Sequence, residues 1–281
     1  MQAPVPPGAT PPLETLRDEL LKGTPPAPMI RRLKEDHLQG LPPKHIHTHD
    51  RPMPALQANA YREAVESARS GAPMLQVLQR LRNISLHPQP DASADDTAFI
   101  GNSARVALMF EILDDVASRR EKALVFLESR AVQDWLVEIL QRRYRLPNRV
   151  LVINGEVSGT HRKARVDEFQ GRADFDVMLL SPKAGGVGLT LTAANHVIHL
   201  ARWWNPAVED QCTDRVFRIG QDKPVHVHHV LAIHPEYGDR SFDLRLAALL
   251  ERKRGLNRAV LAPTAATDTD YEELFQETTR L

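Results

Sequence analysis

The sequence predicts an α/β fold in which a parallel sheet carries helices on both faces, behind a mostly helical first segment. Between residues 103 and 232, short apolar stretches alternate with stretches of helical periodicity, an order typical of βαβ units. The stretches 124–127, 150–153 and 177–180 read LVFL, VLVI and VMLL. Uninterrupted apolar strands of this kind are buried on both faces, which favours a parallel sheet.

Periodicity and turn signals give the expected elements in order. In the first third, helices are expected at 13–21, 29–38, 55–70 and 73–86, with an edge strand at 44–49 and a polar loop at 89–100. The strands that follow are expected at 122–127, 149–153, 176–180, 196–200 and 225–232. Between and after them, helices are expected at 103–119, 131–144, 160–169, 206–219, 240–255 and 271–279.

Local chemistry supports the helix over 206–219. Asn205 is a good N-cap, and Pro206 fits the first helical position, where no amide donor is needed. Gly220 is placed to end the helix. At the level of whole segments we expect a proline-rich leader over 1–27, a helical linker over 28–100, an α/β lobe over 101–235 and a helical extension over 236–281.

Bulk properties exclude several classes of protein. The formal net charge is zero, so no global field attracts a polyanion, and Cys212 is the only cysteine, so no intrachain disulfide can form. No apolar run approaches the ~20 residues that span a membrane, and the N-terminus does not read as a signal peptide. His45, His47 and His49 share one strand face, but no cysteine or carboxylate spacing supports a metal site, and none is expected. We therefore expect a soluble intracellular protein.

The stretch 179–221 carries the chemistry. Gly185, Gly186 and Gly188 follow an apolar strand, where backbone amides can approach a phosphate; a purely structural tight turn is the alternative. In the following helix, spacings of three and four place four side chains on one face: Gln211, Asp214, Arg215 and Arg218. Guanidinium groups match phosphate geometry. The alternative is a pair of surface arginines in ion pairs with Asp214 and Glu209, which contributes little.

This stretch closely resembles motifs V and VI of the Swi/Snf family of DNA-translocating ATPases, in helicase superfamily two. Weaker likeness extends the match over about residues 28–232, including the segments 30–36, 41–44, 81–88 and the Asn154-Gly155 turn. The resemblance implies a RecA-like (P-loop NTPase-type) fold. It identifies the chain as the C-terminal helicase lobe together with the end of the first lobe.

The resemblance also implies roles for individual residues. Arg215 and Arg218 would be arginine fingers that reach ATP on another lobe, with Gln211 and Asp214 orienting them. The glycines would lie at the nucleotide, and Trp204 would link the nucleotide site to the DNA site. Ser181, Lys183, Arg162 and Lys163 would contact the DNA backbone. Pro182 departs from the family pattern and has no amide to donate to a phosphate.

The sequence has no G-x-x-x-x-G-K-[ST] motif, and no apolar strand ends in an Asp-Glu pair. ATP and Mg²⁺ are therefore expected to be held mainly by a first helicase lobe outside these 281 residues, and the chain alone is expected to be inactive. Double-stranded DNA is the expected partner. The compartment would be the cytoplasm of a prokaryote, beside the nucleoid, or the nucleus of a eukaryote.

Two other functions stay open from the sequence. The lobe could be a non-catalytic module that binds DNA or a protein partner. It could also belong to an RNA or single-strand helicase of the same superfamily, although the Arg-Ile-Gly-Gln ending and the Trp-Asn-Pro corner argue against this.

Overall fold

The computed structural model describes residues 41–90, 95–184, 188–260 and 265–280, together with Thr15 and Lys22. The expected helix at 29–38, nearly all of the one at 13–21, and the likeness over 30–36 lie outside the described residues. So do Gly185 and Gly186.

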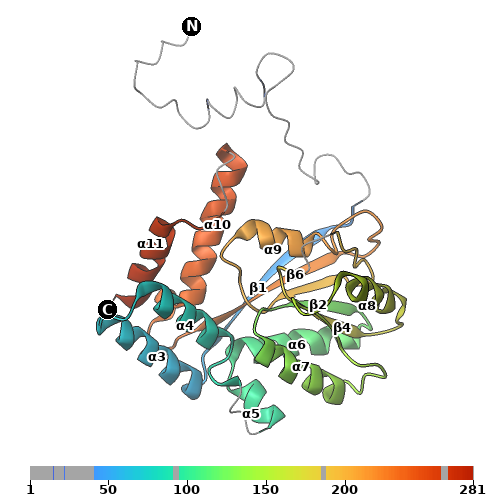
Figure 1. Cartoon of the computed structure of the whole chain (residues 1–281), viewed down its shortest axis with the longest axis horizontal. Coiled ribbons are helices and arrows are strands. Elements are labelled where there is room, and N and C mark those ends of the chain that lie inside the picture. The colour runs from blue at the N-terminus through green and yellow to red at the C-terminus, as the bar shows by residue number, and fades with distance from the viewer. Residues whose placement is uncertain are drawn as a thin grey trace.

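The centre of the molecule is a six-stranded sheet in the order β1-β6-β5-β2-β4-β3, and every paired neighbour is parallel (Figure 1). The strands are β1 (Lys44–Pro52), β2 (Lys122–Phe126), β3 (Leu151–Ile153), β4 (Asp176–Leu180), β5 (His196–His199) and β6 (Val225–Ile233). The expected parallel α/β sheet and its edge strand over 44–49 are confirmed. β1 runs three residues further than expected and pairs with β6 along its whole length.

Each face of the sheet carries its own helices. One face packs on α5 (Asp96–Gly101), α6 (Ala104–Ser118) and α7 (Arg130–Arg143). The other packs on α8 (Gly159–Gly171) and α9 (Pro206–Thr213). Side chains of successive residues in β2 and β4 enter the two cores alternately, as the period of a strand requires. This explains why these strands are apolar throughout.

The remaining helices form a separate helical unit beside the sheet. It consists of α3 (Ala55–Arg69), α4 (Met74–Leu86), α10 (Phe242–Val260) and α11 (Asp268–Thr279), with a short 3-10 turn at Gly238–Arg240. Its core joins residues from both ends of the chain, including Tyr61, Leu81, Phe242 and Leu250. Figure 1 shows α3 and α4 beside α10 and α11 at one end of the sheet.

The expected loop at 89–100 is wrong in part. Residues 89–100 were expected to form a polar loop, but α5 begins at Asp96. The Asp95 side chain caps it by accepting from the Ala98 amide at 2.8 Å. Phe99 is fully buried and stacks on His87 and Trp135. A helix of this length with one buried aromatic side chain leaves no periodicity to detect.

A buried ion pair ties the helical unit to the sheet. Arg105 on α6 and Asp243 on α10 are both fully buried, and the guanidinium donates to the carboxylate through two nitrogens. Asp243 also accepts from the Ala232 amide in β6 at 2.7 Å, and Arg105 donates to the Leu200 carbonyl after β5 at 3.2 Å. The pair therefore joins four elements, and each charge depends on its partner.

We expect Asp243→Ala to lower the free energy of unfolding by about 3–5 kcal/mol, because it leaves the Arg105 charge buried without a counter-ion. Urea unfolding of the whole chain measures the loss. Arg142→Ala is the matched control, because its partner Asp96 and Arg142 itself are exposed; an exposed pair contributes at most about 1 kcal/mol. Equal losses in the two variants would contradict the assigned role of Asp243.

Candidate functional site

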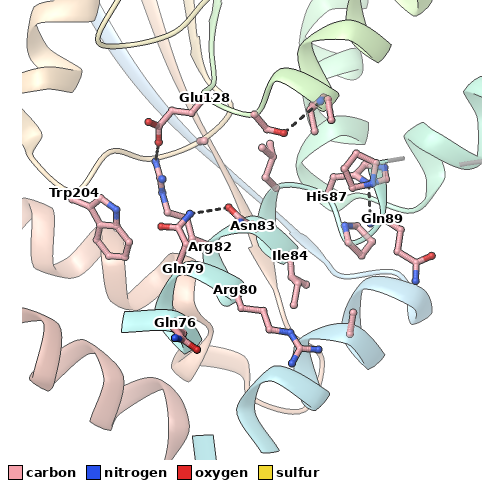
Figure 2. A pocket seen from close by; sticks show the side chains of 18 of the residues that line it. Gln76, Gln79, Arg80, Arg82, Asn83, Ile84, His87, Gln89, Glu128 and Trp204 are labelled. Carbon is pink, nitrogen blue, oxygen red and sulfur yellow. Dashed lines mark hydrogen bonds and ion pairs between the residues drawn. The ribbon is translucent and has the colours of Figure 1, made fainter. Parts of the chain in front are cut away.

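The carboxyl ends of β2, β4 and β5 lie together, and ligands of open parallel sheets bind at such an edge. The loops after these strands, with α4, line an open cavity of about 1240 Å³. Figure 2 shows this cavity. Its wall includes Arg82, Glu128, Lys183, Trp203 and Trp204. The structure thus brings Lys183 and Trp204, two of the residues singled out from the sequence, into one cavity.

Arg82 is the organising residue of this cavity, and sequence analysis did not assign it a role. From α4 it forms an ion pair with Glu128 at 2.5 Å and donates to the Arg202 carbonyl at 3.1 Å. Its guanidinium lies over the rings of Trp203 and Trp204, at 5.3 and 5.5 Å from their centroids. The sequence signals were an arginine on the apolar face of a helix and its place in the segment 81–88, which carries part of the family resemblance.

The two tryptophans have different surroundings. Lys183 lies over the Trp203 ring at 5.4 Å, which leaves a cation and an aromatic face at the cavity wall. Trp204 also meets Phe242 and Tyr271 edge-on, at 5.8 and 5.3 Å, and so packs against the core of the helical unit. Trp204 therefore connects the helical unit to the carboxyl edge of the sheet.

Ser181 lies two residues before Lys183 and is held in a polar cluster. Its hydroxyl accepts from Gln133 at 3.0 Å, and Gln133 accepts from Asn154 at 3.2 Å. These contacts join the loops after β3 and β4 to α7. Gly188 is the first described residue after Ala184. Its φ of +61° is a backbone conformation that L side chains rarely adopt.

Gln211, Asp214, Arg215 and Arg218 were expected on one face of a single helix, and this expectation is wrong. Asn205 caps α9 through the Ala207 amide at 2.9 Å, with Pro206 in the first turn, as predicted. The helix ends at Thr213, however, so that only Gln211 lies on it. Asp214, Arg215 and Arg218 lie on the turns that follow.

A tertiary hydrogen bond explains the early end of α9. The Arg215 carbonyl accepts from the Leu191 amide at 2.9 Å, and the amides of Val216 and Phe217 both return to Thr213. Val216 and Phe217 are thereby buried in the core under this face of the sheet. Gly220, with φ of +97°, and the buried Gln221 close the segment. Gln221 donates to the Ala194 carbonyl at 2.7 Å and is a positioning residue that sequence analysis did not single out.

Arg215 and Arg218 are half-buried, and Gln211 is exposed. Burial lowers the pKa of Arg215, and the neighbouring charge of Arg218 lowers it further, whereas Asp214 acts in the opposite direction. Two half-buried guanidinium groups that repel each other favour a bound anion.

Glu209 is not their partner, because it is the centre of a buried network. Its two oxygens accept from Arg202 at 2.8 and 2.9 Å, from the Trp203 amide at 2.8 Å and from Arg254 of α10 at 2.8 Å. Burial would raise the Glu209 pKa, but the charge of Arg202 outweighs burial and the pKa lies far below its ordinary value. Burial also lowers the pKa of the adjacent His199 to about 4, so this ring is neutral at pH 7.

Arg162 and Lys163 lie elsewhere, on α8, and are not part of the cavity wall. Arg162 donates to the Val157 carbonyl at 2.7 Å, whereas Lys163 is exposed. Among the described residues, no three or more His, Cys, Asp or Glu side chains are arranged to hold a metal ion. No helix in those same parts of the chain is both long and apolar enough to cross a bilayer.

Comparisons with known proteins bear on the family and the fold of this chain. The model of the helicase conserved C-terminal domain matches residues 105–220. The protein YwqA of Bacillus subtilis is 33% identical over 88% of this chain and 28% of its own length. The chromodomain-helicase-DNA-binding protein 8 of Xenopus tropicalis is 28% identical over 90% of this chain and 12% of its own. The chain thus spans less than a third of these relatives.

A solved structure gives the same fold. The SWI2/SNF2 ATPase core of Sulfolobus solfataricus in complex with dsDNA is 25% identical and superposes with a TM-score of 0.66. The match covers 89% of this chain and 53% of that one. The expected RecA-like lobe is therefore confirmed.

We expect Glu209→Gln to destabilise the chain by about 3–5 kcal/mol, because Arg202 and Arg254 then lose their shared buried counter-charge. Glu251→Gln is the control, since Glu251 binds the same Arg254 from an exposed position, and should cost at most about 1 kcal/mol. Urea unfolding at pH 7 measures both. Because the folded pKa of Glu209 is depressed, its contribution is present above the ordinary carboxyl range and is lost in acid. Equal effects of the two substitutions would contradict the network.

Proposed function

This chain belongs to the Swi/Snf family of helicase-like ATPases, as its C-terminal helicase lobe, and we propose that it works as half of an ATP-driven motor on double-stranded DNA. In this proposal, Arg215 and Arg218 reach ATP bound by a first lobe. The cavity at the carboxyl edge of the sheet faces the DNA backbone.

The observation that carries the proposal is the state of the two arginines. They are half-buried and close enough for one charge to depress the pKa of the other. Glu209, one of the two carboxylates that could pair with them, is already bound to Arg202 and Arg254. A triphosphate is the anion that would satisfy both guanidinium groups.

The arginines would act at the transferring phosphoryl group. Charge develops on its oxygens in the transition state, and a positioned guanidinium there is worth about 10³–10⁵ in rate. Because α9 ends at Thr213, both side chains project from turns held by Leu191 and Gln221 rather than from a helix face. Binding of ATP and Mg²⁺ is assigned to the first lobe, since the sequence of this chain contains no phosphate-binding loop motif.

Contact with DNA is proposed through the cavity wall. Lys183 provides a cation beside Trp203, and Ser181 lies at the end of the same strand. Phosphate contacts of this kind carry little sequence preference and weaken as salt rises. Arg162 and Lys163 on α8 would form a second contact with the backbone. A motor that acts on DNA would lie in the cytoplasm of a prokaryote or in the nucleus of a eukaryote.

We expect Arg218→Ala to abolish DNA-stimulated ATP hydrolysis by this chain when an ATP-binding first lobe is joined to it. The expected loss is about 10³-fold or more, because the transition-state charge is no longer compensated. Arg142→Ala, an exposed arginine on the remote helix α7, should leave the rate unchanged. Steady-state phosphate release measures both, and turnover of Arg218→Ala at the wild-type rate would refute the finger assignment.

We expect Lys183→Ala to weaken binding of this chain to a duplex of any sequence and to reduce the magnitude of the salt slope by about 1, the effect of one lost phosphate contact. Fluorescence anisotropy with two unrelated duplexes, over a range of salt concentrations, measures this. Lys223→Ala is the control, because Lys223 lies at the opposite end of the strands, 3.7 Å from Glu121. An unchanged slope in Lys183→Ala would place the DNA elsewhere.

A further inference from the structure

Six histidines from three neighbouring strands share one face of the sheet. In parallel pairing, residues in register point to the same side, and His226 of β6 is in register with both His45 of β1 and His196 of β5. The same register places His47 beside His228. The histidine array consists of His45, His47, His49, His196, His226 and His228.

A line of hydrogen bonds runs through the histidine array. His49 Nε2 lies 3.1 Å from His228 Nδ1, and His228 Nε2 lies 3.1 Å from His196 Nδ1. The line ends where His196 Nε2 meets the Glu121 carboxylate at 2.8 Å. On a parallel branch, His47 Nε2 lies 3.0 Å from His226 Nδ1.

Neutral rings satisfy every one of these contacts. Each contact between two rings needs one N–H and one lone pair. If every ring carries its proton on Nε2, then each Nε2 donates to the next Nδ1, and His196 donates to Glu121. A second proton on any accepting Nδ1 would turn it into a donor that faces another donor.

Protonation would also bring like charges together. The rings stack with centroids 5.0 Å apart for His47 and His228 and 5.0 Å apart for His196 and His226. Burial lowers the pKa of His49, His196, His226 and His228, and for His228 the neighbouring imidazoles lower it further, to about 2. These four rings are therefore neutral at pH 7, and adding protons to them is unfavourable.

The surrounding charges do not offset this. Glu121, after α6, bonds directly only to His196 among the six rings, and it is shared with Lys223 at 3.7 Å. Asp115 favours a charge on His196, while Arg119 opposes it. Asp50 favours a charge on His49. Arg51, two residues on, is paired with Glu111 of α6.

Metal binding is the other use of clustered imidazoles. In the described parts of the chain, no three such side chains converge on one point. The facing nitrogens of the array are instead engaged with each other at hydrogen-bond distance. The observed arrangement therefore fits a proton-sensitive contact better than a metal site.

We propose that the histidine array is a proton-sensitive clasp, which holds the edge strand β1 on β6 while its rings are neutral and loosens when they are protonated. β1 has no other strand neighbour in the described sheet. It leads directly into α3, so loosening it also loosens the helical unit that carries Arg82. Because the folded pKa values of His49, His196, His226 and His228 lie below the ordinary value of 6.5, the stabilisation from these rings is present above about pH 6.5 and declines as the pH falls.

Hydrogen exchange of the full chain at pH 7.5 and 5.5, corrected for intrinsic rates, tests the clasp. The β1 amides bonded to β6 should lose at least tenfold more protection at pH 5.5 than those of the central strand β2. The central strand serves as reference, because other buried histidines such as His199 make the whole fold acid-sensitive. His228→Gln should give weak β1 protection at both pH values. His161→Gln, an exposed histidine on α8, should behave as wild type.

Three results would overturn the proposal. One is equal loss of protection in β1 and β2, and another is an unchanged pH response in His228→Gln. The third is strong protection of β1 by one equivalent of Zn²⁺ together with no effect of pH, which would make the array a metal site. If His228→Gln does not fold, the pH dependence of the imidazole C–H resonances in the NMR spectrum of the wild-type chain tests the proposal instead. Protonation of the array rings must then coincide with exchange of the β1 amides.

Discussion

The buried carboxylate of Glu209 is the interaction on which the candidate site depends. It accepts from Arg202 after β5, from the Trp203 amide and from Arg254 of α10, and so fixes α9 between the sheet and the helical unit. A buried carboxylate that binds two guanidinium groups has no capacity for more. Arg215 and Arg218 lie on the turns just beyond, so Glu209 does not compensate their positive charge, which is what the proposed function uses.

The same region connects the proposed arginine fingers to the cavity proposed to contact DNA. Trp203 and Trp204 follow Arg202 directly, and Arg82 lies over both rings while it binds Glu128 and the Arg202 carbonyl. A movement of α9 would displace Arg202, which binds Glu209, and with it the cavity wall that includes Lys183. In the proposed function, this continuous set of contacts would link phosphate chemistry at the arginines to grip on the DNA backbone.

Most of the fold could be predicted from the sequence, because short apolar stretches alternate with stretches of helical periodicity, an order typical of βαβ units. The end of α9 could not, because the hydrogen bond from Leu191 to the Arg215 carbonyl joins residues distant in sequence and overrides helical periodicity. Lys183 and Trp204 were found from motif resemblance, whereas Arg82 and Gln221 were missed, since each acts through contacts made only after folding. His45, His47 and His49 were seen to share one strand face, but their hydrogen bonds to the histidines of β6, and from there to β5, depend on the register of the three strands.

ATP hydrolysis by this chain, with and without duplex DNA, tests the central claim most directly when it is measured before and after addition of a separately purified first lobe. The account predicts no hydrolysis by the chain alone and DNA-stimulated hydrolysis once the lobe that binds ATP is added. Hydrolysis by the 281 residues alone would contradict it, because an ATP site would then lie within this chain.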